Sequence, residues 1–150
     1  MKKTRTALLF VACFCLGSFV WAAEDGQGFV IIQKDDTGLD ERAGNRIKSY
    51  LLHGDPSKEG LYIMRIRFPA GQASRPHHHD QDRFITVIEG TWHVGTDQVF
   101  DMDQTVPIKA GGFMKHPAGA VHFDGAKDEA VVVEIRGMGP VKTTSVARSD

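Results

Sequence analysis

The sequence predicts an all-β domain, a sandwich or barrel of short strands, on three observations. Its apolar runs are short, rich in Val, Ile and Phe, and separated by glycine, proline, aspartate and asparagine. Between Leu61 and Phe68 the residues alternate in character, which places Arg65 and Arg67 together on one face of an extended strand. No internal repeat, low-complexity tract or long linker interrupts this pattern. We therefore expect a single β domain.

The expected strands follow the apolar runs in chain order. They cover residues 29–32, 61–68, 84–88, 106–108 and 131–135. Residues 39–51 are ambiguous, because apolar residues recur there at helical spacing while Gly44 interrupts them. We expect a strand in the second half of this stretch, from about Arg46 to His53.

The first 22 residues have the pattern of an export signal. A basic start is followed by an uncharged apolar run from Ala7 to Trp21 and then by small residues, which is typical of a secretory signal peptide. We expect residues 1–22 to be this signal, with cleavage after Ala22, and residues 23–150 to be an exported domain, periplasmic or secreted. The alternative is an uncleaved N-terminal anchor.

Cleavage would change the charge and the cysteine content of the domain. Removing Lys2, Lys3 and Arg5 lowers the basic count from 18 to 15 against 19 acidic residues, a net charge of about −4. A mildly acidic domain lacks the electrostatic footprint of a nucleic-acid or anionic-membrane binder. Both cysteines, Cys13 and Cys15, leave with the signal, so the expected domain forms no disulfide and depends on a packed core.

The histidines are concentrated in one part of the chain. All seven lie between His53 and His122, and three of them, His77, His78 and His79, are consecutive. In a strand, His77 and His79 would face the same side while His78 faces the other. Two imidazoles presented together are half of a metal site, and imidazole suits Zn, Cu, Fe and Ni. The alternative is a solvated histidine cluster in a loop.

Two segments carry a spaced pattern of glycine, proline and histidine. In residues 71–90, Gly71 is followed after five residues by the histidine triplet, then after three more by Arg83, and after six more by Gly90. In residues 111–126, five residues separate Gly111 from Pro117-Ala118-Gly119-Ala120-Val121-His122, and Ala126 follows after three more. The two segments, in this order, resemble the first and second motifs of the cupin superfamily. The resemblance is to its small one-domain bacterial members and covers most of residues 23–150.

The resemblance implies a fold and a metal centre. Cupins are jelly-roll β-barrels, in agreement with the strand pattern. By this resemblance His77, His79 and His122 would converge inside the barrel on one divalent transition metal per domain: Fe, Mn, Ni, Zn or Cu. Gly90 and Gly119 would allow tight turns between strands.

Two positions depart from the family pattern. The Glu that serves as fourth ligand is Arg83 here, and the closing Asn is Ala126. Arginine stays cationic and cannot ligate a metal. Three arrangements remain open: Gln81 or Asp82 replaces the missing ligand, or three histidines and waters hold the metal while Arg83 binds an anionic substrate, or the metal has been lost.

The functional expectation has two classes. The first is a metal-dependent enzyme on a small oxygenated or anionic molecule, of dioxygenase, lyase or isomerase type, with Arg83 and His116 as candidate catalytic residues and Arg83 as a candidate substrate-binding residue. The second is a non-catalytic module of the cell envelope that binds a small ligand or a metal. Both imply a small-molecule partner, no nucleic acid and no membrane contact after cleavage, and both leave a homodimer open.

Overall fold

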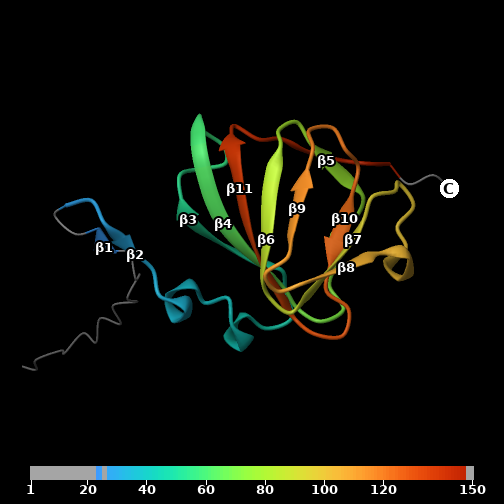
Figure 1. Cartoon of the computed structure of the whole chain (residues 1–150), viewed down its shortest axis with the longest axis horizontal. Coiled ribbons are helices and arrows are strands. Elements are labelled where there is room, and N and C mark those ends of the chain that lie inside the picture. Colours follow the sequence, from blue (N-terminus) through green and yellow to red (C-terminus); the bar gives the residue numbers. More distant parts are fainter. Residues whose placement is uncertain (1–22, 25–26, 148–150) are drawn as a thin grey trace, which may run out of the picture. The chain divides into compact units, whose positions relative to one another are not determined.

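The computed structural model describes residues 23–24 and 27–147 and divides into two compact units, residues 1–31 and 32–150 (Figure 1). Within the first unit, β1 (Ala23–Glu24) and β2 (Val30–Ile31) pair antiparallel. The signal peptide predicted for residues 1–22 lies outside the described residues, and it stays a prediction.

The second unit is a jelly-roll barrel of antiparallel strands. The larger sheet has the order β3 (Lys48–His53), β4 (Gly60–Phe68), β11 (Val131–Gly139), β6 (Arg83–Glu89) and β9 (Phe113–His116). The smaller sheet has the order β10 (Phe123–Gly125), β7 (Thr91–Gly95) and β8 (Val106–Lys109). A separate pair joins β12 (Thr143–Ser145) to β5 (His77–His79). The all-β jelly roll expected from the sequence is thus confirmed.

Helical structure in the described part of the chain is limited to single turns. These are the 3₁₀ turns η1 (Lys34–Thr37), η2 (Glu41–Ala43) and η3 (Met102–Gln104). None of the described helices has the length and apolar character needed to cross a bilayer. Residues 39–51, for which the sequence pattern was ambiguous, contain the turn η2, whose Ala43 is buried, and the start of strand β3 at Lys48. The strand expected from about Arg46 is therefore correct to within two residues.

The core lies between the two sheets. On β4, the alternation expected from the sequence buries Tyr62 and Phe68 and turns Arg65 and Arg67 to the opposite face. The buried cluster continues across β11, β6 and β7, through residues such as Val133, Ile85 and Trp92. Burial of this apolar surface is the main source of stability in a domain without disulfides.

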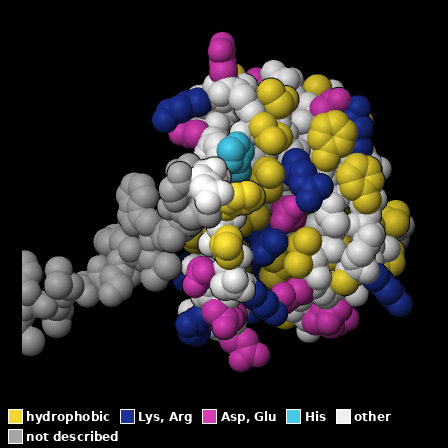
Figure 2. All heavy atoms as spheres, turned by 60° about the vertical axis from the view of Figure 1, so that its left-hand side comes forward, with side chains coloured by type: hydrophobic (Ala, Val, Ile, Leu, Met, Phe, Trp, Pro, Cys, Tyr) yellow, Lys and Arg dark blue, Asp and Glu magenta, His cyan; other side chains and the backbone are white. Residues whose placement is uncertain are grey.

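The outer face of the large sheet carries a cluster of two arginines around one buried carboxylate. Glu134 on β11 is only 7% exposed, and its two carboxylate oxygens accept from Arg65 Nε at 3.1 Å and Arg136 Nη2 at 2.5 Å. Exposed apolar side chains, among them Phe84 and Met138, surround this cluster on the same face. On the face shown in Figure 2, hydrophobic side chains lie between basic and acidic ones.

Backbone contacts tie the two motif segments together. Gly119, at φ +77°, allows the turn after Pro117, and its N–H donates to the carbonyl of His79 at 2.7 Å. His77 and His122 exchange two backbone hydrogen bonds, each 2.9 Å long. Residues 45 positions apart in the sequence are thus held side by side by main-chain atoms alone.

Candidate metal centre

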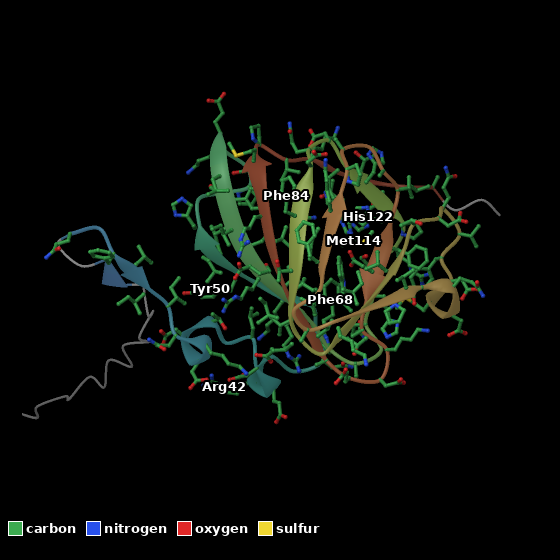
Figure 3. All side chains as sticks on the ribbon, viewed as in Figure 1. Arg42, Tyr50, Phe68, Phe84, Met114 and His122 are labelled. Carbon is green, nitrogen blue, oxygen red and sulfur yellow. The ribbon has the colours of Figure 1, made fainter. Side chains whose placement is uncertain are left out.

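His77, His79 and His122 come together in the barrel. Ring centroids are 4.4 Å apart for His77 and His122, 4.9 Å for His77 and His79, and 5.3 Å for His79 and His122. One ring nitrogen from each lies within 4.8 Å of the others. We call this group the outer set. Figure 3 shows His122 inside the barrel. His78 is not part of the group, as strand alternation predicts.

The outward ring nitrogens of the outer set are each bound to an oxygen. Nδ1 of His77 lies 2.7 Å from the carbonyl of Arg75, Nδ1 of His122 lies 3.0 Å from the carbonyl of Ala120, and Nδ1 of His79 lies 3.0 Å from Thr143 Oγ1. A carbonyl only accepts, so Nδ1 carries the proton in His77 and His122. This leaves Nε2 as a lone-pair donor, and Nε2 of His122 is buried without a partner. Metal-ligating histidines are held in the same way, so the residues fit a metal.

Burial keeps the imidazoles of His79 and His122 neutral at neutral pH. It lowers the pKa of His79 to about 3, with the nearby Arg83 guanidinium as the next cause. It lowers the pKa of His122 to about 4, against a smaller opposite effect from its hydrogen bond to Ala120. A metal ligand must be neutral imidazole, and both residues meet that condition without metal.

Arg83 points into the same space. It is the first residue of β6, its register partner on β9 is His116, and its Nη1 donates to Nε2 of His79 at 2.6 Å. Its Nε is buried without a hydrogen-bond partner. Among the described residues no carboxylate forms an ion pair with Arg83. The nearby Asp82 pairs with Lys115 instead, and Glu89 pairs with Lys34. Arg83 is a half-buried cation that binds a ligand atom of the outer set.

The structure does not bring Gln81 or Asp82 into the outer set. Asp82 accepts from the backbone N–H of Ala118 at 2.8 Å and pairs with Lys115 Nζ at 2.6 Å. Gln81 is exposed. A fourth ligand from these residues has no support in this arrangement, because the Asp82 carboxylate is already bound elsewhere.

A second group of possible ligands lies deeper in the barrel. His116, His122 and Asp124 offer ligand atoms within 4.8 Å of one another, and all three side chains are buried. We call them the inner set. Sequence reasoning named His116 only as a candidate acid or base and missed Asp124. The missed signal is the i, i+2 spacing of His122 and Asp124, which puts both on one side of an extended chain.

The inner set has unusual electrostatics. Burial lowers the pKa of His116 to about 2, with His122 as the next cause, and both of its ring nitrogens lack a partner. Burial also raises the pKa of Asp124, against smaller opposite effects from His77, Ser74 and Arg83. Ser74 Oγ donates to Asp124 Oδ1 at 3.0 Å. The His116 ring lies 3.7 Å from that of His122 and 5.5 Å from Trp92, between centroids.

One member of the outer set, His77, and two of the inner set, His116 and Asp124, border a cavity of about 180 Å³. Polar side chains at its wall are Ser74, His77, Arg83, His116 and Asp124. The rest of the wall is apolar and comes from Ile47, Ile66, Phe68, Ile85, Trp92, Val133 and Ile135. A few converging polar groups in an apolar wall are typical of a small-ligand site. At about 30 Å³ per water this space matches on the order of six waters, so only a small molecule fits.

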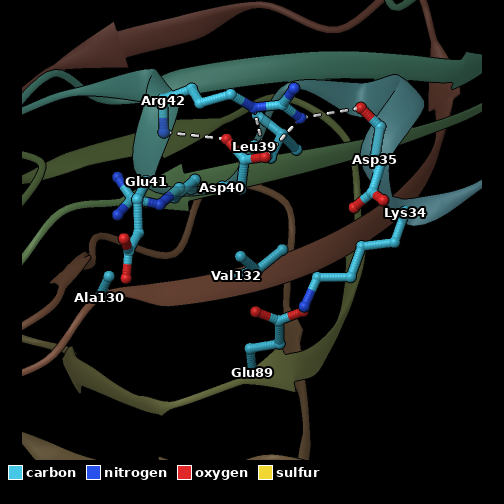
Figure 4. Close-up of a pocket in the computed structure, with 10 residues that line it drawn as sticks. Lys34, Asp35, Leu39, Asp40, Glu41, Arg42, Glu89, Ala130 and Val132 are labelled. Carbon is cyan, nitrogen blue, oxygen red and sulfur yellow. Dashed lines mark hydrogen bonds and ion pairs between the residues drawn. The ribbon is translucent and has the colours of Figure 1, made fainter.

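A larger hollow, about 550 Å³, lies elsewhere, at the η1 and η2 turns (Figure 4). Its ion pairs are internal: Lys34 Nζ lies 2.7 Å from Glu89, and Arg42 Nη2 lies 2.5 Å from Asp40. Neither metal-ligand group of the described chain borders it. The smaller cavity is therefore the candidate site.

Comparisons with known proteins agree with this fold. The family model described as "Domain of unknown function (DUF4437)" matches residues 34–147. A cupin superfamily protein from Desulfitobacterium hafniense is 16% identical, with 63% of this chain and 78% of that chain covered and a TM-score of 0.52. The polyketide cyclase RemF from Streptomyces resistomycificus is 16% identical, with 67% and 72% covered and a TM-score of 0.55.

The DMSP lyase DddQ from Ruegeria pomeroyi is also 16% identical, with 77% of this chain and 59% of that chain covered and a TM-score of 0.57. No curated protein matches the sequence. At these identities the solved structures establish the jelly-roll fold and leave the chemistry to be argued from the site.

Proposed function

Since this chain belongs to the DUF4437 family and to the cupin superfamily, we propose that it is a metal-dependent protein that acts on a small anionic molecule. The ion would be held by the outer set, His77, His79 and His122, and the anion by Arg83. The anion would occupy the 180 Å³ cavity, whose wall includes both His77 and Arg83.

The observation that carries the proposal is the fixed orientation of the three imidazoles. Each outward nitrogen is bound to an oxygen, and the inward nitrogens lie within one ion's reach of one another. Buried polar atoms without a partner are costly, and Nε2 of His122 is such an atom. A divalent ion would satisfy it.

The anion is inferred from the charge of Arg83. A half-buried guanidinium without a carboxylate partner is unfavourable unless a ligand supplies the negative charge. Asp82 and Glu89 already pair with lysines, and Asp80 accepts from the backbone N–H of Lys142. A small carboxylate or enolate would accept from Arg83, which is suited to bidentate contact. Arg83 would then leave His79 and free its Nε2 for the metal.

The chemistry divides between the metal and the chain. A bound divalent ion supplies Lewis acidity towards a substrate oxygen. Arg83 binds and orients the anionic group, and the apolar wall excludes water. His116, neutral and with both nitrogens unpartnered within the described chain, can offer one N–H and one lone pair as hydrogen-bonding groups beside the substrate. This arrangement suits a dioxygenase, lyase or isomerase. A polyketide cyclase and a DMSP lyase use the same fold.

The second candidate is a non-catalytic module of the cell envelope that binds a small ligand or metal. The contact between Arg83 and His79 favours it, because the guanidinium occupies an atom that an enzyme of the usual cupin pattern would use for its metal. Turnover distinguishes the two candidates, whereas metal and anion binding are common to both.

Calorimetric titration with Zn²⁺, in chloride buffer and then in saturating acetate, tests the proposal. Acetate should tighten Zn²⁺ binding about tenfold, because an anion that draws Arg83 away frees His79. His122→Ala should abolish binding in both buffers, while the control His78→Ala should leave it unchanged. Absence of Zn²⁺ binding with acetate present would overturn the proposal. So would a tenfold effect of acetate that persists in Arg83→Met.

A further inference from the structure

We infer that the cavity contains a second, inner metal position, formed by His116, His122 and Asp124, where the ion rests while Arg83 remains on His79. The inference deepens the proposed function and rests on it, because it concerns the same ion before the anion arrives. It assigns a ligand role to two residues outside the family's motif pattern, His116 and Asp124.

Geometry and burial support this position. The three ligand atoms lie within 4.8 Å of one another, and the residues are 3%, 2% and 7% exposed respectively. Within residues 23–24 and 27–147, neither ring nitrogen of His116 has a partner, nor has Nε2 of His122. Two imidazoles and a carboxylate form a recognised set for divalent transition metals. Buried polar atoms that converge without partners are what a missing ion would satisfy.

The two sets cannot be filled together. They share His122, whose Nδ1 is bound to the carbonyl of Ala120 at 3.0 Å, so that only Nε2 is available. One ring nitrogen ligates one ion. The cavity therefore holds a single ion with two alternative positions.

Arg83 decides between the positions. While its Nη1 lies 2.6 Å from Nε2 of His79, the outer set has lost one of its three ligand atoms. The outer set also contains no carboxylate, so an ion there would place two positive charges beside the guanidinium with no negative charge among its ligands. The inner set contains Asp124, whose carboxyl group would bind the ion as a carboxylate and so reduce this repulsion. Asp124 thus replaces the carboxylate that the family pattern has at position 83.

The test compares ligand substitutions in acetate-free buffer, with Zn²⁺ as the probe. His116→Leu and Asp124→Asn should each weaken binding at least tenfold, whereas His79→Ala should weaken it less than threefold. Asp128→Asn, the same change at an exposed position, is the matched control and should have no effect. Circular dichroism checks that each variant folds. If either His116→Leu or Asp124→Asn does not fold, the other still tests the inner position.

A second arm removes the guanidinium. In Arg83→Met the outer set is complete, so His79→Ala should now weaken Zn²⁺ binding at least tenfold and His116→Leu less than threefold. With Cu²⁺ as the probe, electron paramagnetic resonance should show two coupled ring nitrogens in the wild type and three in Arg83→Met.

The outcomes separate the two ideas. Equal losses of Zn²⁺ affinity in His79→Ala and His116→Leu, measured without acetate and with Arg83 present, would overturn the inner position. The proposed function would still stand. Absence of Zn²⁺ binding by the acetate-free wild type, if binding appears with acetate, would likewise overturn only the inner position. Absence of binding under both conditions and in Arg83→Met would overturn both.

Discussion

Nη1 of Arg83 donates to Nε2 of His79 at 2.6 Å, so a permanent cation occupies the lone pair that a metal at the outer set would need. Nδ1 of the same ring is bound to Thr143 Oγ1 at 3.0 Å. His79 is thus bound at both nitrogens, unlike His122, whose Nε2 has no partner. The competition between guanidinium and metal for His79 is the distinctive property of this cavity.

Arg83→Glu should raise the affinity for a divalent metal at least tenfold, about 1.4 kcal/mol. The change frees Nε2 of His79, removes a repulsive charge and adds an anionic ligand, and all three effects act in the same direction. Zn²⁺ calorimetry measures the gain. Lys58→Glu makes the same change of charge at a position whose side chain is 77% exposed, and should alter affinity little. A folded Arg83→Glu protein with unchanged affinity would contradict the competition.

The metal-free barrel should lose stability as the pH falls below about 6.5. His79, His116 and His122 have folded-state pKa values of about 3, 2 and 4, while in the unfolded chain each titrates near 6.5. Between these values the unfolded chain binds protons that the folded protein does not, so the free energy of unfolding decreases. The slope is ~1.4 kcal/mol per pH unit for each proton. The raised pKa of Asp124 has the opposite effect: at pH values above the unfolded pKa of this carboxyl group, the folded state binds the proton more tightly, so a fall in pH there stabilises the fold.

Urea unfolding with a chelator present, at about pH 7.5 and about pH 5, measures this loss. His116→Leu removes one of the three titrating groups, so its loss between the two pH values should be about one third smaller. Identical free energies of unfolding at both pH values in the wild type would show that the imidazoles are protonated in the folded barrel.

Gly90→Ala should destabilise the protein more than Gly111→Ala. Both glycines have positive φ, +72° and +85°, which costs an alanine roughly 1–2 kcal/mol. A Cβ at Gly90 would also collide with the backbone carbonyl of Ala130, whereas at Gly111 it would meet open space. The difference between the two free energies of unfolding isolates the collision, and equal values would refute it.

Export remains a prediction from the sequence. If residues 1–22 are a signal peptide, protein recovered from its native host should begin at Ala23 and lie outside the cytoplasm. Intact-mass measurement of the secreted or periplasmic fraction decides this, because an uncleaved anchor would leave the full chain.

Strand alternation explains which parts of the site could be foreseen. It separated His77 and His79 from His78, and it placed Arg65 and Arg67 together on one face of their strand, because a period of two follows from backbone geometry alone. It did not reach His116, which precedes a turn that breaks the alternation. The structure places His116 inward as the register partner of Arg83.

Long-range pairing accounts for what the sequence did not disclose. The Asp82 carboxylate is bound by Lys115 and by the backbone N–H of Ala118, which lie more than 30 residues away in the sequence. Local spacing therefore could not show that Asp82 is unavailable as a metal ligand. The contact of Arg83 with His79 depends on how β5 and β6 approach each other. Asp124 was within reach of the alternation argument from His122, but an isolated aspartate in a strand gives no sign that it is buried.

The paired backbone hydrogen bonds between His77 and His122, 2.9 Å each, have a consequence for ion choice. Main-chain atoms fix the separation of these two residues before any ion arrives, and the Nδ1 contacts orient their rings, so ion binding need not order the chain and its entropic penalty is small. Two imidazole ligands held in this way also cannot move freely towards or away from a bound ion. The affinity of the barrel for divalent ions should therefore depend on their radius and preferred geometry, because the rigid backbone cannot adjust to an ion of the wrong size.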